Sequence, residues 1–350
     1  MLNTVHRPKY GFYFIACFFM VFAGFSAHWA CTIDKKAPEQ AFYYWRSEVQ
    51  LTQAEEAYLS GLQVERLYVK YFDVDWSEKE GAVPVSTVQW GQGNWRKFEI
   101  VPVVFLTNRI WTLGANPYDL AQKILQRTYD LHPDGMLLKE VQIDCDWTNN
   151  TRDAYFAFLE TLRVALATEG FQLSVTLRLH QFADPAGTGI PPVDRVMLMC
   201  YNTGDVSDSR TNNSILEETD IAPYLKSSEA YPIPLDVVLP LFRWTAVYRD
   251  GKLAHLIHGL DDPALVDTAH FNIDPGHRYI AKNDTYVDGY LLYAGDTLRT
   301  EAVTKDKLAS VWRMIQPRTA PVQRLAWYHL SPEAVKQYPA VELLEIAGSK

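Results

Sequence analysis

The chain has 350 residues, of which 48% are hydrophobic and 21% charged, and its formal net charge at pH 7 is -9. This length allows one large domain or two small ones. The acidic balance, with no Lys/Arg cluster beyond short doublets, argues against nucleic acid and anionic membrane surfaces as partners. An acidic chain with 10 Trp and 20 Tyr suits neutral ligands such as carbohydrates, because sugar faces stack on flat aromatic rings.

The N-terminal segment has the pattern of an export signal. Residues His6, Arg7 and Lys9 precede an apolar run from Tyr10 to Ala30. Because the run ends at Cys31, residues 1–31 fit a lipoprotein signal that is cut before this cysteine, which then carries the lipid. An uncleaved transmembrane anchor of roughly 21 residues is the alternative. Either reading predicts an exported protein, periplasmic or on the outer membrane, that contacts the membrane only through this lipid or anchor.

Two cysteines remain outside the signal, Cys145 and Cys200. Each lies in an apolar segment typical of a strand, on the side expected to face surrounding helices. We therefore expect two buried free thiols rather than a disulfide.

After a polar tether at residues 32–40, strand-like and helix-like segments alternate through residues 41–350. Their apolar, β-branched character predicts a parallel sheet covered by helices on its outer side. Eight such repeats and a final helix predict a single α/β domain with the (β/α)8 TIM barrel fold. An open doubly wound sheet is the alternative, but no Gly-rich phosphate loop follows any strand. The expected strands are 42–45, 66–72, 100–106, 136–145, 172–180, 195–201, 235–242 and 324–329.

Four helix starts carry recognisable capping patterns. Thr52 opens a Thr-x-x-Glu capping box, and Asn116 and Ser331 each precede a proline in the first helical turn. A further helix is expected to begin near Thr151.

Two insertions interrupt the barrel, after its second and seventh strands. Residues 77–98 contain Trp90-Gly-Gln-Gly-Asn-Trp95 and are expected to form a rim over the barrel mouth. Residues 244–296 are expected to form β-hairpins, with a turn at Arg249-Asp250-Gly251.

The most informative motif is the strand that ends in Asp144 and Asp146. Side chains alternate along a strand, so the two carboxylates share one face, with Cα atoms roughly 6.6 Å apart. At the C-terminal end of a barrel strand they would lie in an active site. Like charges so close raise one pKa, which favours one proton donor and one ionised partner.

Four segments resemble strands of chitinase-like glycoside hydrolases of family eighteen, and one of them, residues 235–244, resembles the seventh strand. Val141-Gln-Ile-Asp144-Cys-Asp146-Trp147-Thr148 is similar to the fourth-strand signature Asp-Gly-x-Asp-x-Asp-x-Glu, and Met197-Leu-Met199-Cys-Tyr201-Asn202 to the sixth-strand Met-x-Tyr-Asp. Residues 325–330 resemble the eighth strand, where that family places a Trp beneath the sugar. The resemblance implies a carbohydrate site at the C-terminal face of the barrel, with Tyr201, Asn202 and Trp327 in contact with sugar.

The departures from this pattern concern the catalytic acid. Thr148 stands where that family has its general-acid glutamate, Val141 replaces the first signature Asp, and Asn202 replaces an Asp. A threonine hydroxyl cannot usefully protonate a glycosidic oxygen, so the family's own mechanism should fail here.

Other polar residues could complete the site. Asp73 and Asp75, after the second strand, repeat the spacing of Asp144 and Asp146 and are candidates for the missing carboxylate. The fifth strand is expected to place Arg178 and His180 on one face, where the neighbouring Asp144 and Asp146 would pair with them. The alternative is a buried ion network with a purely structural role.

Tryptophans end several of the predicted strands. Trp45, Trp76, Trp147, Trp244 and Trp327 fall at or near C-terminal strand ends, where a ring of aromatic side chains would make a carbohydrate platform. No cofactor or metal is expected, because His255 and His258 lack a third ligand nearby.

Three functions are considered, in this order. The first is a glycoside hydrolase with Asp146 as proton donor or base, Asp144 tuning its pKa, and Arg178 and His180 positioning substrate. The second is a glycan-binding protein that has lost the catalytic acid, as Thr148 suggests. The third is a cell-envelope scaffold with a blocked barrel mouth.

Overall fold

The computed structural model describes Met1 and residues 37–226, 230–260, 264–319 and 322–348. The predicted export signal and Cys31 lie outside the described residues, so their role stays a prediction. Within the described ranges, no helix is both long and apolar enough to cross a bilayer.

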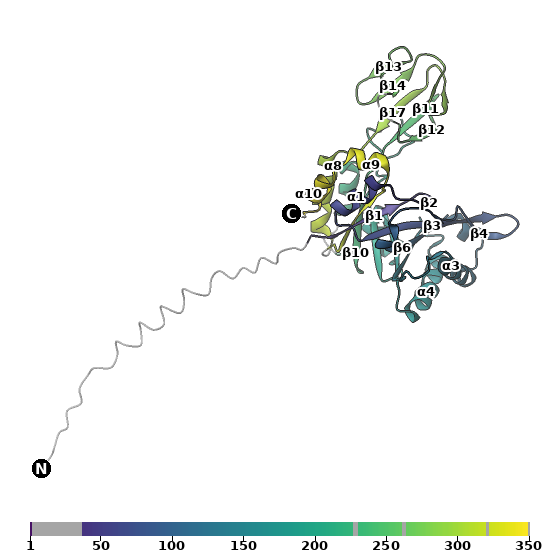
Figure 1. Cartoon of the computed structure of the whole chain (residues 1–350), viewed down its shortest axis with the longest axis vertical. Coiled ribbons are helices and arrows are strands. Elements are labelled where there is room, and N and C mark those ends of the chain that lie inside the picture. The colour runs from purple at the N-terminus through teal and green to yellow at the C-terminus, as the bar shows by residue number, and fades with distance from the viewer. Residues whose placement is uncertain (2–36, 227–229, 261–263, 320–321, 349–350) are drawn as a thin grey trace. The chain divides into compact units, whose positions relative to one another are not determined.

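Eight parallel strands close into a barrel, which confirms the predicted (β/α)8 fold (Figure 1). The closing strand is β1, where Phe42 aligns with Trp327 of the last strand and with Leu67 of the second. The first strand begins at Glu39, one residue before the predicted end of the tether at residue 40. The barrel strands are β1 (Glu39–Tyr44), β3 (Arg66–Ser77), β6 (Glu99–Leu106), β7 (Glu140–Asp144), β8 (Gln172–Arg178), β9 (Arg195–Met199), β10 (Leu235–Pro240) and β18 (Arg324–Tyr328).

Alternation along these strands separates two cores. A small cluster, including Tyr43, Met197 and Ala326, fills the barrel interior, whereas the larger core lies between the strands and the helices. Cys145 and Cys200 are buried free thiols, and Cys145 belongs to the outer core, as predicted.

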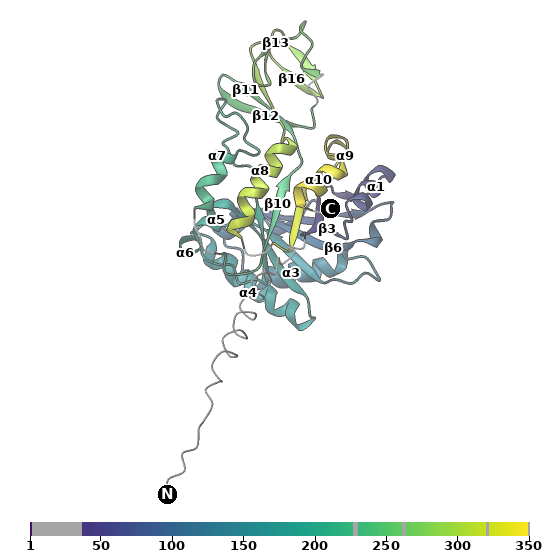
Figure 2. The ribbon, with the colours of Figure 1, turned by 90° about the vertical axis from the view of Figure 1, so that its left-hand side faces the viewer.

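Helices cover the outside of the barrel, and their predicted caps are present. Thr52 and Glu55 form the complete capping box, and the side chains of Asn116 and Ser331 each accept a backbone hydrogen bond. Figure 2 shows α8 and α10 side by side. The helices are α1 (Gln53–Gly61), α2 (Arg109–Thr112), α3 (Pro117–Leu131), α4 (Arg152–Thr168), α5 (Leu179–Ala183), α6 (Pro185–Thr188), α7 (Glu218–Ile221), α8 (Lys305–Ile315), α9 (Pro332–Gln337) and α10 (Ala340–Ala347), with 3-10 turns η1 (Trp95–Lys97), η2 (Ala222–Leu225) and η4 (Gln316–Arg318).

The first insertion does not form the predicted rim over the mouth. Strand β3 continues past the barrel into a hairpin with β4 (Gly81–Val85), and β5 (Gln89–Trp90) then pairs with β2 (Glu48–Val49). The indole of Trp90 donates a 2.9 Å hydrogen bond to the carbonyl of Leu131, the last residue of α3. Because α3 follows β6 and runs back from the mouth, this contact holds Trp90 near the opposite end of the barrel.

The second insertion forms a separate antiparallel sheet, in agreement with the predicted hairpins (Figure 1). Its turn is the predicted one, since Asp250 and Gly251 both have positive φ angles. The strand order is β12-β11-β17-β14-β13, made of β11 (Trp244–Arg249), β12 (Lys252–His258), β13 (Phe271–Asp274), β14 (Arg278–Ala281) and β17 (Thr297–Glu301), with a small hairpin of β15 (Thr285–Val287) and β16 (Tyr290–Leu292).

The N-terminal half of the barrel interior holds a buried ion network. Arg324 contacts Glu140 at 2.6 Å and donates a 3.0 Å hydrogen bond to Tyr68, while Arg195 pairs with Asp236 at 3.0 Å. Burial raises the pKa of Asp236 to about 6 despite these cations. This part of the interior is therefore packed and structural. The candidate functional residues lie closer to the C-terminal mouth of the barrel.

Candidate functional site

Asp144 is the last residue of β7 and points into the barrel. Beneath it on the same strand face, Gln142 accepts a 2.6 Å hydrogen bond from the hydroxyl of Tyr43. Oδ1 of Asp144 accepts a 2.7 Å hydrogen bond from Thr176 of β8. Burial raises the pKa of Asp144 to about 6, and the Thr176 hydrogen bond opposes this effect. Asp144 thus changes protonation state just below neutral pH.

Asp146 lies beyond the end of the strand and is held by Arg178. Nη1 of Arg178 donates a 2.9 Å hydrogen bond to Oδ2 of Asp146. The two side chains are 36% and 52% exposed, so solvent screens the ion pair and its contribution to stability is small. Its main effect is to orient the Asp146 carboxylate beside Asp144. The structure therefore brings together three members of the predicted charged cluster.

His180 does not share the strand face of Arg178, because β8 ends at Arg178 and α5 begins at Leu179. The imidazole of His180 is exposed. Its pKa is lowered by partial burial and by the positive charge of Arg178, while the Asp146 carboxylate opposes this shift. His180 is therefore near the acids but is not fixed by a hydrogen bond to either of them.

Thr148 is turned away from the acids. Its backbone N–H donates a 2.9 Å hydrogen bond to Oγ1 of Thr151, and the two hydroxyl oxygens are 3.3 Å apart. The strand has ended four residues earlier, so the alternation that would have aimed position 148 into the barrel no longer applies.

Four half-buried rings form a connected group at the mouth, and two of them, Tyr201 and Tyr328, lie near Asp144. We call Trp45, Tyr201, Phe242 and Tyr328 the mouth aromatics. The rings of Tyr201 and Tyr328 stack at 5.1 Å, that of Trp45 lies 5.5 Å from Tyr328, and that of Phe242 lies 5.9 Å from both tyrosines. Together they form a continuous aromatic surface that solvent can reach.

Asp73 joins the mouth, and a bulge in β3 is the reason. The register shifts between Lys70 and Phe72, so Lys70 and Asp73 lie on the same face although they are three residues apart. Lys70 Nζ contacts Asp73 at 3.1 Å and lies 5.7 Å from the Trp45 ring centre. The Asp73 carboxylate is close enough to raise the pKa of Asp144, although less than burial does.

Asp75 is engaged in a rim ion pair and is a poor candidate for the second catalytic carboxylate. Arg109 donates two hydrogen bonds of 2.6 Å to its carboxylate, and Thr107 donates a third. These bonds hold the pKa of Asp75 well below its usual range.

The predicted ring of five tryptophans does not form. Trp327 is fully buried in the outer core and donates a 2.8 Å hydrogen bond to Gln40, because its neighbours Ala326 and Tyr328 take the inward positions. Trp147 is buried against Tyr155, and Trp76 packs against the same outer core.

Two further predicted sugar contacts lie at the edge of the site. Trp244 is buried, with its ring centre 5.2 Å from that of Phe242 and its indole N–H bonded to Glu301. Asn202 is exposed and has a positive φ angle of 53°. Of the predicted tryptophans, Trp45 alone contributes a half-buried ring to the mouth aromatics.

Sequence reasoning missed Tyr328, Phe242 and Lys70. Tyr328 could have been found by alternation. It follows the inward-facing Ala326 by two residues, as Trp45 follows Tyr43. Lys70 could have been found in the same way, because it follows the inward-facing Tyr68 by two residues and precedes the bulge. Among the described residues, no group of three His, Cys, Asp or Glu side chains is arranged to bind a metal ion.

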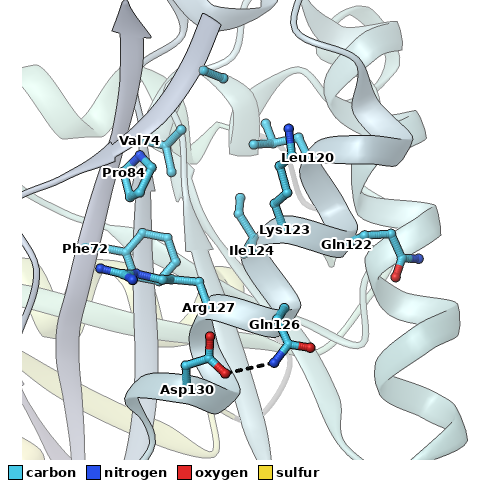
Figure 3. Close-up of a pocket in the computed structure, with 11 residues that line it drawn as sticks. Phe72, Val74, Pro84, Leu120, Gln122, Lys123, Ile124, Gln126, Arg127 and Asp130 are labelled. Carbon is cyan, nitrogen blue, oxygen red and sulfur yellow. Dashed lines mark hydrogen bonds between the residues drawn. The ribbon is translucent and has the colours of Figure 1, made fainter. Parts of the chain in front are cut away.

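Two surface hollows lie away from the acids. One, of about 510 Å³, lies outside the barrel between β3, β4 and α3, with Phe72, Val74 and Pro84 facing Leu120 and Ile124 (Figure 3). It is the gap left where the first insertion replaces a covering helix. The other, of about 620 Å³, is lined by polar residues from Thr203 to Tyr224. Neither hollow is lined by Asp144 or Asp146, so the convergence of charges and rings, rather than hollow size, defines the site.

The fold is similar to that of several solved structures, although the sequence identity to them is low. No family profile matches the chain, and no curated protein matches it in sequence. The spore cortex-lytic enzyme SleL of Bacillus megaterium superposes with a TM-score of 0.55 at 14% identity, over 91% of this chain and 76% of that one.

Two further structures agree with this match. SleL of Bacillus cereus gives 0.51 at 14% identity over 88% of this chain and 74% of that one. Catalytic domain 2 of the Ostrinia furnacalis Group II chitinase gives 0.51 at 12% identity over 89% and 97%. The chain therefore has a chitinase-like (β/α)8 fold.

Proposed function

We propose that this protein binds a carbohydrate across the C-terminal mouth of its barrel. The mouth aromatics offer ring faces for stacking, and the carboxylates of Asp73, Asp144 and Asp146 can accept hydrogen bonds from sugar hydroxyls. The observation that carries the proposal is the convergence of these half-buried rings on Asp144, the acid with a pKa of about 6.

The fold neighbours support a carbohydrate ligand by analogy. The Ostrinia structure is named a chitinase and the two Bacillus structures are named cortex-lytic enzymes. Because a barrel of this kind hosts many functions, the site residues rather than the fold carry the argument.

Hydrolysis is the second candidate function. A carboxyl with a pKa of about 6 is a suitable proton donor, and the ion-paired Asp146 beside it would be the ionised partner. In this reading Asp144 is the general acid, a role that the sequence assigned first to Asp146.

Two observations favour binding over hydrolysis, the reverse of the order expected from sequence. Thr148 faces Thr151 rather than the mouth, so it does not occupy the position of a catalytic acid. Asp75, a predicted candidate for the missing carboxylate, is bound by Arg109 and Thr107 instead.

The test is a glycan array read in parallel for binding and for release of reducing ends, with the wild-type chain, Asp144→Asn and Trp45→Ala. Asp119→Asn is the control, because it removes the same charge from an exposed residue of α3. Binding that Trp45→Ala weakens at least about tenfold, without release, supports the binding function. Release that Asp144→Asn abolishes supports hydrolysis, and silence in both assays contradicts both functions.

We also propose that the protein is exported and anchored at its N-terminus, on the evidence of residues 1–31 alone. In cells, Cys31→Ser should abolish metabolic labelling with a fatty acid and release the protein from the membrane fraction. Membrane retention with no labelling of the wild-type chain would instead indicate an uncleaved anchor.

A further inference from the structure

The acids at the mouth differ in whether a cation neutralises them. Asp73 pairs with Lys70, and Asp146 pairs with Arg178. Asp144 lies between them and forms no ion pair with any residue that the structure describes. One carboxylate at the centre of the mouth is therefore left with a neutral hydrogen-bond donor as its only fixed partner.

The other titratable groups near Asp144 do not remove this excess of negative charge. The groups that face Asp144 are Tyr43 from β1, Asp73 from β3, Thr176 and Arg178 from β8, Tyr201 from the segment after β9, Tyr328 from β18, and Asp146 just beyond the end of β7. The tyrosines are neutral at physiological pH, because burial raises the pKa of each phenol. Three carboxylates thus face two cations.

The rings around this carboxylate favour a cation as well. The faces of Trp45, Tyr201 and Tyr328 carry the negative lobe of the aromatic quadrupole, and Lys70 already lies 5.7 Å from the ring centre of Trp45. A partly desolvated carboxylate beside several ring faces is a setting that attracts an ammonium group.

We infer that the sugar bound at the mouth is an amino sugar whose amine is free and protonated, with its ammonium group placed between Asp144 and the mouth aromatics. This inference rests on the proposed carbohydrate binding and narrows its ligand class. An N-acetylated or purely hydroxylated sugar would leave the Asp144 charge unneutralised. The ammonium group supplies the missing partner.

The test compares three tetrasaccharides by calorimetry at about pH 6.5: a glucosamine oligomer, its fully N-acetylated form and a cello-oligomer. The glucosamine oligomer should bind at least about tenfold more tightly than either neutral oligomer. Its advantage should shrink as NaCl rises from about 50 mM to about 500 mM, because salt screens the ammonium–carboxylate attraction. This salt series needs no variant.

Asp144→Asn should reduce the ratio of the affinity for the glucosamine oligomer to the affinity for its N-acetylated form to about one. Asp119→Asn should leave this ratio unchanged. The outcomes separate the two proposals. Equal or tighter binding of the neutral oligomers overturns the amino-sugar inference and keeps the carbohydrate site. A ratio that survives Asp144→Asn also overturns the inference, and no binding of any oligomer contradicts carbohydrate binding itself.

Discussion

The hydroxyl of Thr176 donates a 2.7 Å hydrogen bond to Oδ1 of Asp144, across the pair of strands β7 and β8. Among the described residues it is the one hydrogen bond to the Asp144 carboxylate, and it favours the charged form. The protonation state of the central acid therefore depends on a neutral residue of the neighbouring strand.

Thr176→Val should raise the pKa of Asp144 above its value of about 6. A hydrogen bond to a charged group contributes about 1.5–3 kcal/mol, which corresponds to a rise of about one to two pKa units. The measurement is a carbon-detected NMR titration of the Asp144 carboxyl. Ser174→Ala, one inward-facing position lower on β8, is the control, and an unchanged pKa in Thr176→Val would contradict the assignment.

Asp144→Asn should change how stability depends on pH. Because folding raises the pKa of Asp144 to about 6, its protonated form stabilises the fold below the unfolded-state pKa, and this contribution is lost as pH rises through about 6. The variant removes this loss. Relative to wild type, it should gain up to about 3 kcal/mol between pH 4 and pH 7.5.

Urea unfolding of both proteins at these two pH values measures the difference. Asp236 also has a pKa of about 6, but it is present in both proteins and its effect cancels. Parallel pH profiles would show that Asp144 is not the group that titrates.

Two tryptophans should separate binding from stability. Trp327→Ala should lower the free energy of unfolding by about 3–5 kcal/mol, because it empties a fully buried site and leaves Gln40 without its donor. Trp45→Ala should cost about 1 kcal/mol but should abolish most glycan binding. Thermal unfolding and calorimetry with the same oligomer give both values, and equal losses of binding in the two variants would contradict the inward facing of Trp45.

Thr148→Glu should not create hydrolytic activity, although it restores the residue that the resembling family has at this position. Residue 148 lies in the turn that leads into α4, and its side chain faces Thr151. Release of reducing ends from N-acetylated oligomers should stay at the level of the wild-type chain. A gain of about tenfold or more would place position 148 in the site.

Much of this architecture was predictable because its signals are local. Strand ends and helix caps depend on a few consecutive residues. The caps at Thr52 and Asn116 are at the predicted residues, and β7 ends at Asp144, one residue before the predicted end. The site was predicted in part: Asp144, Asp146 and Arg178 converge, whereas His180 leaves the strand because a helix begins one residue before it.

The remaining errors concern which side chains point into the barrel. Alternation predicts the direction of a side chain only while the strand stays regular. It fails at Thr148, beyond the end of β7, and counted from Tyr68 it would turn Asp73 outward, because the bulge in β3 lies between these two residues. At Trp327 the strand is regular, but the predicted alignment placed the wrong member of the Trp327–Tyr328 pair inside.

The sequence by itself determined the barrel, its insertions and the pair of acids that ends β7, since strand periodicity and caps depend on neighbouring residues. Only the tertiary structure decided that Arg178 neutralises Asp146 and Lys70 neutralises Asp73, so that Asp144 is left with Thr176. Arg178 and Thr176 come from β8, 32 residues beyond the acids they contact, whereas Lys70 reaches Asp73 on its own strand because of the bulge in β3. Their distances, and therefore the pKa of Asp144, exist only once the barrel has closed.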